Sequence, residues 1–114
     1  SRKGQIQSDY IFDEVRIPLT PQSDISKASK LLEEILTRTD AEHLTGAREA
    51  FGQDYPNFVH EAEGGPRILV SIEPKQVWLK GKFVTPFRSR NDLRTKICQE
   101  FLQRIKTETD ISVA

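Results

Sequence analysis

The hydrophobic positions of the chain change their spacing along its length, and each change predicts a new element. Between residues 10 and 19, apolar Val15, Ile17 and Leu19 alternate with polar residues or proline. This period of two predicts a strand with one buried face. From about residue 24 to 38, after a break at Thr20-Pro21, the apolar residues recur every three or four positions. That spacing is typical of an amphipathic helix.

The stretch from 39 to 65 is less regular. We expect it to form an insertion at about residues 40–65, with a short separate helix that ends before Gly52. Gly64-Gly65-Pro66 ends the insertion, because glycine and proline interrupt regular structure.

The second half of the chain predicts four further elements. A branched apolar run at 68–72 indicates a strand, and a turn at 73–75 follows it. Alternation over 77–87 predicts a long strand antiparallel to the preceding one. Residues 89–105 carry a second helical stripe, and 111–113 alternate as a last short strand.

This order of strand, helix, strand, strand, helix and strand predicts an α+β fold. Because a crossover between parallel strands is nearly always right-handed, the order favours a ferredoxin-like βαββαβ two-layer sandwich with a helical insertion after the first helix. Both helices would cover one face of the sheet and leave the other face free. Pro18 and Pro86 should mark strand ends, since proline cannot donate a ladder hydrogen bond.

Composition narrows the class of protein. The length of 114 residues favours one domain. The chain has 17 Lys+Arg and 17 Asp+Glu, and this balance of charge argues against a protein whose main function is to bind polyphosphate. No apolar run approaches the roughly 20 residues of a membrane helix. A single cysteine excludes an intrachain disulfide. Because the chain contains no methionine, we expect it to be a fragment of a longer protein.

Reactive groups are sparse. His43 and His60 lack the spacing that would place two metal ligands on one helix face. Cys98 lies on an apolar helix stripe, where burial is the simpler explanation. Gly64-Gly65 precedes a strand, whereas a phosphate-binding loop opens a helix. We therefore expect no enzyme activity, no cofactor and no metal.

Charge is distributed unevenly. Residues 67–106 hold ten Lys+Arg and three Asp+Glu, whereas residues 1–66 hold seven and twelve. Basic residues gather around the end of the third strand and the start of the last helix, among them Lys80, Lys82, Arg88 and Arg90. They are either solvated surface positions or the source of a potential that acts on small ions or on the acidic segment 40–63 of a neighbouring subunit.

The segment from Lys80 to Phe87 is partly similar to the third-strand signature of RNA-recognition domains. Lys80, Gly81 and Phe87 match it, but Lys82 and Val84 occupy positions where aromatic residues are expected. A free-standing ferredoxin-like binding domain for RNA or a small ligand is therefore the alternative function.

Several short segments occur in a characteristic order and spacing: Ser23-Asp24-Ile25, Pro66-Arg67-Ile68-Leu69-Val70, Val77-Trp78-Leu79, Lys82-Phe83-Val84, Arg88-Ser89-Arg90 and Asp110-Ile111-Ser112-Val113-Ala114. In these segments the chain resembles the C-terminal cytoplasmic portion of the small-conductance mechanosensitive ion channel family. Residues 1–10 are similar to the tail end of that family's preceding β-domain or a linker, and residues 11–114 to its C-terminal ferredoxin-like domain.

The resemblance implies a membrane protein that assembles from seven identical subunits, with this domain on the cytoplasmic side. The domain would help subunits assemble and would filter permeating ions in a vestibule, while the tension-gated pore and the membrane segments lie outside the chain. It would bind no nucleic acid. The implied vestibule or portal charges are Lys80, Lys82, Arg88 and Arg90. The implied interdomain or subunit contacts are Trp78, Val84, Ile111 and Val113.

Overall fold

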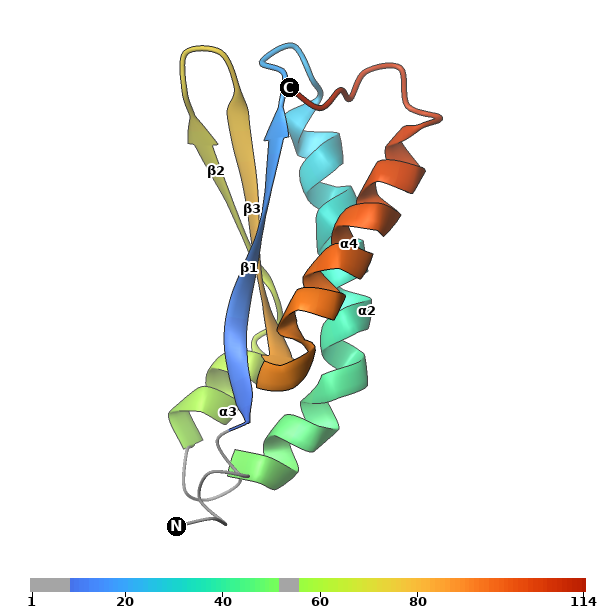
Figure 1. The fold of residues 1–114 in the computed structure, drawn as a ribbon. Helices are drawn as coiled ribbons and strands as arrows, with labels where there is room; N and C mark the ends of the chain where they lie inside the picture. The colour runs from blue at the N-terminus through green and yellow to red at the C-terminus, as the bar shows by residue number, and fades with distance from the viewer. Residues whose placement is uncertain (1–8, 52–55) are drawn as a thin grey trace.

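The computed structural model describes residues 9–51 and 56–114 as an α+β domain (Figure 1). The elements in chain order are β1 (Tyr10–Leu19), α2 (Ile25–Phe51), α3 (Pro56–Glu63), β2 (Arg67–Ile72), β3 (Val77–Pro86), the short 3₁₀ helix η1 (Phe87–Ser89) and α4 (Arg90–Ile105). The predicted bounds of the three strands and of the last helix are confirmed to within about one residue.

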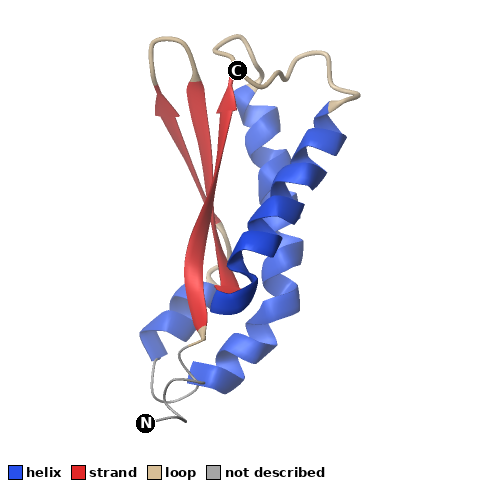
Figure 2. Ribbon diagram, viewed as in Figure 1, coloured by secondary structure: helices blue, strands red, loops and turns tan. Residues whose placement is uncertain are grey.

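The strands form a three-stranded antiparallel sheet in the order β1-β3-β2, so β3 is central. The long helices α2 and α4 pack on the same side of this sheet, as Figure 2 shows. In register, Val15 of β1 lies opposite Gly81 of β3, and Gly81 lies opposite Ile68 of β2. Side chains of alternate strand residues point to opposite faces, so this register decides which residues share a face.

The core lies between the helices and the odd-numbered positions of β1 and β3. Val15, Ile17 and Leu19 have almost no exposed surface, and neither do Leu79 and Phe83. The helices supply the opposing layer: Ala28, Leu32, Ile35 and Leu36 from α2, with Ile97, Phe101 and Ile105 from α4. The alternating apolar residues of the strands and the apolar faces of the helices therefore pack together in one core.

Gly81 allows α2 to approach the centre of the sheet. A Cβ at this position would lie 3.0 Å from Leu32 Cδ2 and closer still to Leu36 Cδ1. The two leucines occupy the space that a larger residue would need. This close approach explains why the strand tolerates a glycine.

The helical part of the predicted insertion differs from the structure. Instead of a helix at 24–38 followed by a separate short helix, α2 continues without a break to Phe51. Residues 39–51 include good helix formers and no proline, and the Thr39 hydroxyl donates to the Ile35 carbonyl oxygen at 2.9 Å. Gly46 is accommodated inside the helix, where the Tyr10 hydroxyl leaves no room for a Cβ. The expected end before Gly52 agrees with the last described residue of α2, and residues 52–55 lie outside the described part of the chain.

The predicted last strand is reduced to a single antiparallel bridge between Val113 and Leu19. The Thr20 N–H donates to the Ser112 carbonyl at 2.9 Å, and the Ala114 N–H donates to the Pro18 carbonyl at 3.0 Å. The segment therefore lies on the side of β1 that faces away from β3. Both prolines lie at strand ends as expected, with Pro18 next to last in β1 and Pro86 last in β3.

A matched pair of leucines tests this assignment of the core. Leu32 of α2 is fully buried and Leu102 of α4 is about half exposed. We predict that Leu32→Ala lowers the free energy of unfolding by about 2–5 kcal/mol, because it leaves a cavity against the sheet. Leu102→Ala should change it by less than about 0.5 kcal/mol. Urea denaturation measures both, and equal losses would contradict this packing.

Candidate functional site

The face of the sheet opposite α2 and α4 carries a strip of basic side chains. Glu14, Lys82 and Arg67 form one row across the three strands, and Arg16, Lys80 and Leu69 form the next. The register thus gathers four cations, Arg16, Arg67, Lys80 and Lys82, on one surface, which we call the open face; it also carries Glu14, whose carboxylate lies 4.0 Å from Arg16 Nε. Its positive potential would attract small anions and acidic groups.

Lys82 is held at one end of the open face by two contacts. Its ammonium forms an ion pair with Glu61 of α3 and lies 4.5 Å from the centre of the Phe12 ring. The hydrogen bond from Lys82 lowers the pKa of Glu61, with a further contribution from the charge of Arg67. Acidic α3 therefore neutralises part of the basic strip within the same chain. This contact uses one carboxylate of the acidic segment 40–63, which one of the two interpretations of the charge pattern placed against a neighbouring subunit.

The other end of the open face holds Trp78, whose ring lies 4.9 Å from the Arg16 guanidinium. Trp78 is opposite Pro18 in register, whereas Phe12 is opposite Val84. Six residues separate these rows, or about 20 Å along the strands. The two rings are therefore far apart, and each is already covered by a cation.

The other two predicted portal charges lie away from this strip. Arg88 is exposed in η1. Arg90 begins α4, where its guanidinium is 3.9 Å from the Phe87 ring and donates to the Phe87 carbonyl oxygen at 2.8 Å. The four predicted charges therefore divide into two lysines on the open face and two arginines beyond the end of β3.

The four predicted contact residues fall into two groups, one buried and one partly exposed. Val84 has no exposed surface and Ile111 is 4% exposed, because the chain itself covers both. Trp78 is half-buried and Val113 is 42% exposed. Only the latter two present substantial surface to another domain or subunit.

A cavity of about 530 Å³ lies beside Lys82, where α3 and the start of β2 meet the sheet. Asp40, His60, Glu61 and Arg67 are among its lining residues.

Asp40 is 7% exposed, and its Oδ1 accepts a hydrogen bond of 2.9 Å from the Val84 N–H. Strand β2 begins opposite Lys82 and so does not extend as far as Val84. The Asp40 carboxylate therefore accepts the hydrogen bond of the Val84 amide in place of a strand neighbour. Burial raises the pKa of Asp40 to about 6, although the hydrogen bond from Val84 opposes the shift.

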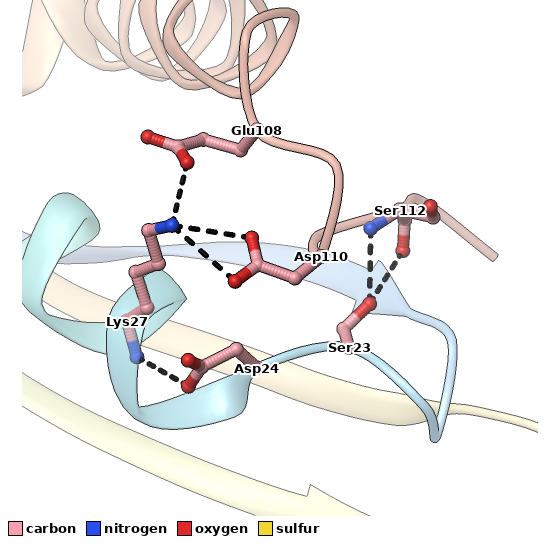
Figure 3. Close-up of polar contacts among 6 residues, drawn as sticks. All are labelled: Ser23, Asp24, Lys27, Glu108, Asp110 and Ser112. Carbon is pink, nitrogen blue, oxygen red and sulfur yellow. Dashed lines mark hydrogen bonds and ion pairs between the residues drawn. The ribbon is translucent and has the colours of Figure 1, made fainter.

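The C-terminal segment is fastened to the start of α2 by a polar cluster (Figure 3). Lys27 Nζ lies 2.6 Å from Glu108 Oε2 and 3.2 Å from Asp110 Oδ1, and these hydrogen bonds raise the pKa of Lys27. The Lys27 amide donates to Asp24 Oδ1 at 3.0 Å, so Asp24 caps the N-terminus of α2. Ser23 Oγ accepts from the Ser112 N–H at 3.0 Å. This cluster holds residues 108–112 against the core and positions Val113 beside β1.

The remaining candidate groups are dispersed. His43 lies on α2 and His60 on α3. Within residues 9–51 and 56–114, no three His, Cys, Asp or Glu side chains gather closely enough to hold a metal ion. Burial raises the pKa of the Cys98 thiol, while the nearby Arg94 guanidinium opposes the shift. None of the helices described is long and apolar enough to cross a bilayer.

Comparison of the chain with known family models, with characterised proteins and with solved structures finds no match.

Three residues of this region were not predicted from the sequence: Arg16 and Arg67 on the open face, and the buried Asp40 beside the cavity. The two arginines join the lysines only through strand register, which is a long-range property. Aligning the three predicted strands on their apolar positions would have found them. Nothing in the local sequence distinguishes Asp40 from the exposed carboxylates of α2.

The titration of Asp40 gives a prediction for stability. Its pKa in the folded protein, about 6, lies above the ordinary value of 3.8, so the folded state binds the extra proton between these values. The resulting stabilisation is complete below about pH 3.8 and is lost as the pH rises through about 6. We predict that the difference in free energy of unfolding, wild type minus Asp40→Asn, falls by about 3 kcal/mol from acid to neutral pH.

Denaturant unfolding of both proteins between about pH 3.5 and 7 measures this difference. Glu42→Gln removes an exposed carboxylate from the same helix and serves as the control. A difference between wild type and Asp40→Asn that is constant with pH would show that Asp40 is not desolvated in the way described.

Proposed function

We propose that this chain is the cytoplasmic vestibule domain of a mechanosensitive ion channel of the small-conductance type. In this role it contributes to subunit assembly and filters ions, while the tension-gated pore lies outside the chain. The permeating ions and other copies of the same subunit, seven in the ring, are its partners. The domain reaches the membrane only through segments outside the chain, and it stands on the cytoplasmic side.

The proposed fold is the ferredoxin-like sandwich. Its support is the antiparallel contact of Val113 with Leu19, on the side of β1 away from β3. With a fourth strand at this edge, the order of the sheet would be last strand, β1, β3, β2. Helices α2 and α4 then serve as the two crossovers on one face. The resemblance to the channel domain implies this same order of elements.

The observation that carries the functional proposal is the open face itself. Two predicted charges, Lys80 and Lys82, share it with Arg16 and Arg67, while helices cover the opposite face. A wall of this kind can tune the local concentration of ions by its fixed charge without any reacting group. Helices α2 and α4 lie behind the sheet, so the charged strands are free to face a solvent-filled space except at the end where α3 contacts Lys82.

The open face is less suited to the alternative of RNA binding. Recognition of single-stranded RNA by such sheets depends on aromatic rings that stack neighbouring bases. Here Phe12 and Trp78 lie at opposite ends of the face, and Lys82 and Arg16 cover them. Stacking would require both cations to leave, so no specific observation favours this alternative.

Ion filtering can be tested in the full-length protein by patch-clamp recording under a salt gradient. We predict a tension-activated current. In the Lys80→Glu/Lys82→Glu variant the reversal potential should shift toward greater cation preference, because two positive charges on the open face become negative. The tension threshold should not change. Raising the ionic strength should reduce the shift.

Lys106→Glu is the matched control, since Lys106 is an exposed lysine just after α4 and away from the open face. Its reversal potential should equal that of the wild type. Absence of any tension-activated current would contradict the proposed function. An equal shift in the control variant would remove the role given to Lys80 and Lys82.

A further inference from the structure

Strand β2 is an unprotected edge of the sheet. Its one strand neighbour in the described part of the chain is β3, so its second edge has no pairing partner there. Leu69, Val70 and Ile72 are 52%, 48% and 82% exposed. Edge strands of soluble proteins are usually guarded by lysine, proline or a bulge, but Arg67–Ile72 pairs continuously with β3 and contains neither residue.

Two of these exposed residues, Val70 and Ile72, share a face with the core, whereas Leu69 lies on the open face. Ile68, Val70 and Ile72 lie opposite Gly81, Leu79 and Val77 of β3, which face the helices. Ile68 packs partly against the core, whereas Val70 and Ile72 lie beyond the cover of α2 and α4. An additional strand beside β2 would extend this apolar layer.

We propose that this edge pairs with the same edge of a second copy of the chain, antiparallel and about a two-fold axis beside Val70. In this register Ile68 lies opposite Ile72 of the other copy, and Val70 lies opposite its counterpart. Arg67 lies opposite Glu73, and the symmetry forms this oppositely charged pair twice. Six branched apolar side chains then meet on the helix side of a continuous six-stranded sheet.

Charge distinguishes this register from its neighbours. The axis must be perpendicular to the sheet, so it passes beside one residue of β2. An axis beside Leu69 would pair Arg67 with Ser71 and form no ion pair. An axis beside Ser71 would place Arg67 opposite Lys75, which is repulsive. Only the register centred on Val70 combines the apolar contacts with attractive charges at both ends.

The contact is isologous, so it cannot close a ring of seven subunits. It is therefore independent of the proposed channel function. A single pair of edge strands also buries less than the roughly 1,200 Å² of a standard stable interface, so the dimer should depend on concentration.

Sedimentation equilibrium of the purified chain over a range of concentrations tests the proposal. We expect a monomer–dimer equilibrium. Arg67→Glu and Glu73→Arg should each raise the dissociation constant about tenfold, because two attractive pairs become repulsive. The double variant Arg67→Glu/Glu73→Arg should restore the wild-type constant. Arg88→Glu, an exposed position away from this edge, should leave it unchanged.

A second pair of variants tests the apolar contact without endangering the fold. Ile72→Thr keeps a β-branched residue at a largely exposed position and should weaken the dimer at least about tenfold. Leu102→Gln also replaces an exposed apolar side chain by a polar one, on α4 and away from this edge, and should have no effect. A chain that stays monomeric at all concentrations, or a dimer insensitive to Ile72→Thr, would overturn the proposal. Failure of the double charge variant to recover would overturn the register.

Discussion

The packing of α2 and α4 against one face of the sheet is the constraint on which the rest of the structure depends. Val15, Ile17 and Leu19 of β1, with Leu79 and Phe83 of β3, are apolar because they meet the helices, and Gly81 must be small to let Leu32 and Leu36 approach. Because side chains alternate along a strand, the same register commits the even-numbered residues to the other face. The core and the basic strip are therefore two consequences of one arrangement.

Polar groups adjust this arrangement where the sheet ends. Asp40 reaches from α2 to the Val84 amide at the point where β2 has not yet begun. Lys27 ties the C-terminal segment to the first turn of α2 through Glu108 and Asp110. These contacts lie at the two ends of the sheet, and the side chains of Asp40 and Lys27 differ in solvent exposure. The carboxylate of Asp40 is desolvated, so its pKa is raised, whereas the side chain of Lys27 is about half exposed and solvent screens its ion pairs.

The sequence-based predictions succeeded where the signal is local. The alternation of Val15, Ile17 and Leu19 and the apolar spacing of α4 report directly on burial, and both elements are confirmed. The continuation of α2 to Phe51 was missed because the apolar stripe becomes irregular after the helix leaves the main core, although the backbone remains helical. The joining of Arg16 and Arg67 to Lys80 and Lys82 depends on register. The burial of Asp40 depends on where a distant strand begins, and neither property can be read from neighbouring residues.

The basic open face and the exposed β2 edge follow from how the helices cover the sheet, and they suggest two separate kinds of contact. The first, with ions, belongs to the proposed channel role, and the second is a symmetric pairing of the domain itself. In the proposed function this domain is one part of a membrane channel. The most direct measurement is the sequence of the encoding reading frame upstream of Ser1. We predict several apolar segments of about 20 residues there, each long enough to span a bilayer. A start codon immediately before Ser1 would contradict it.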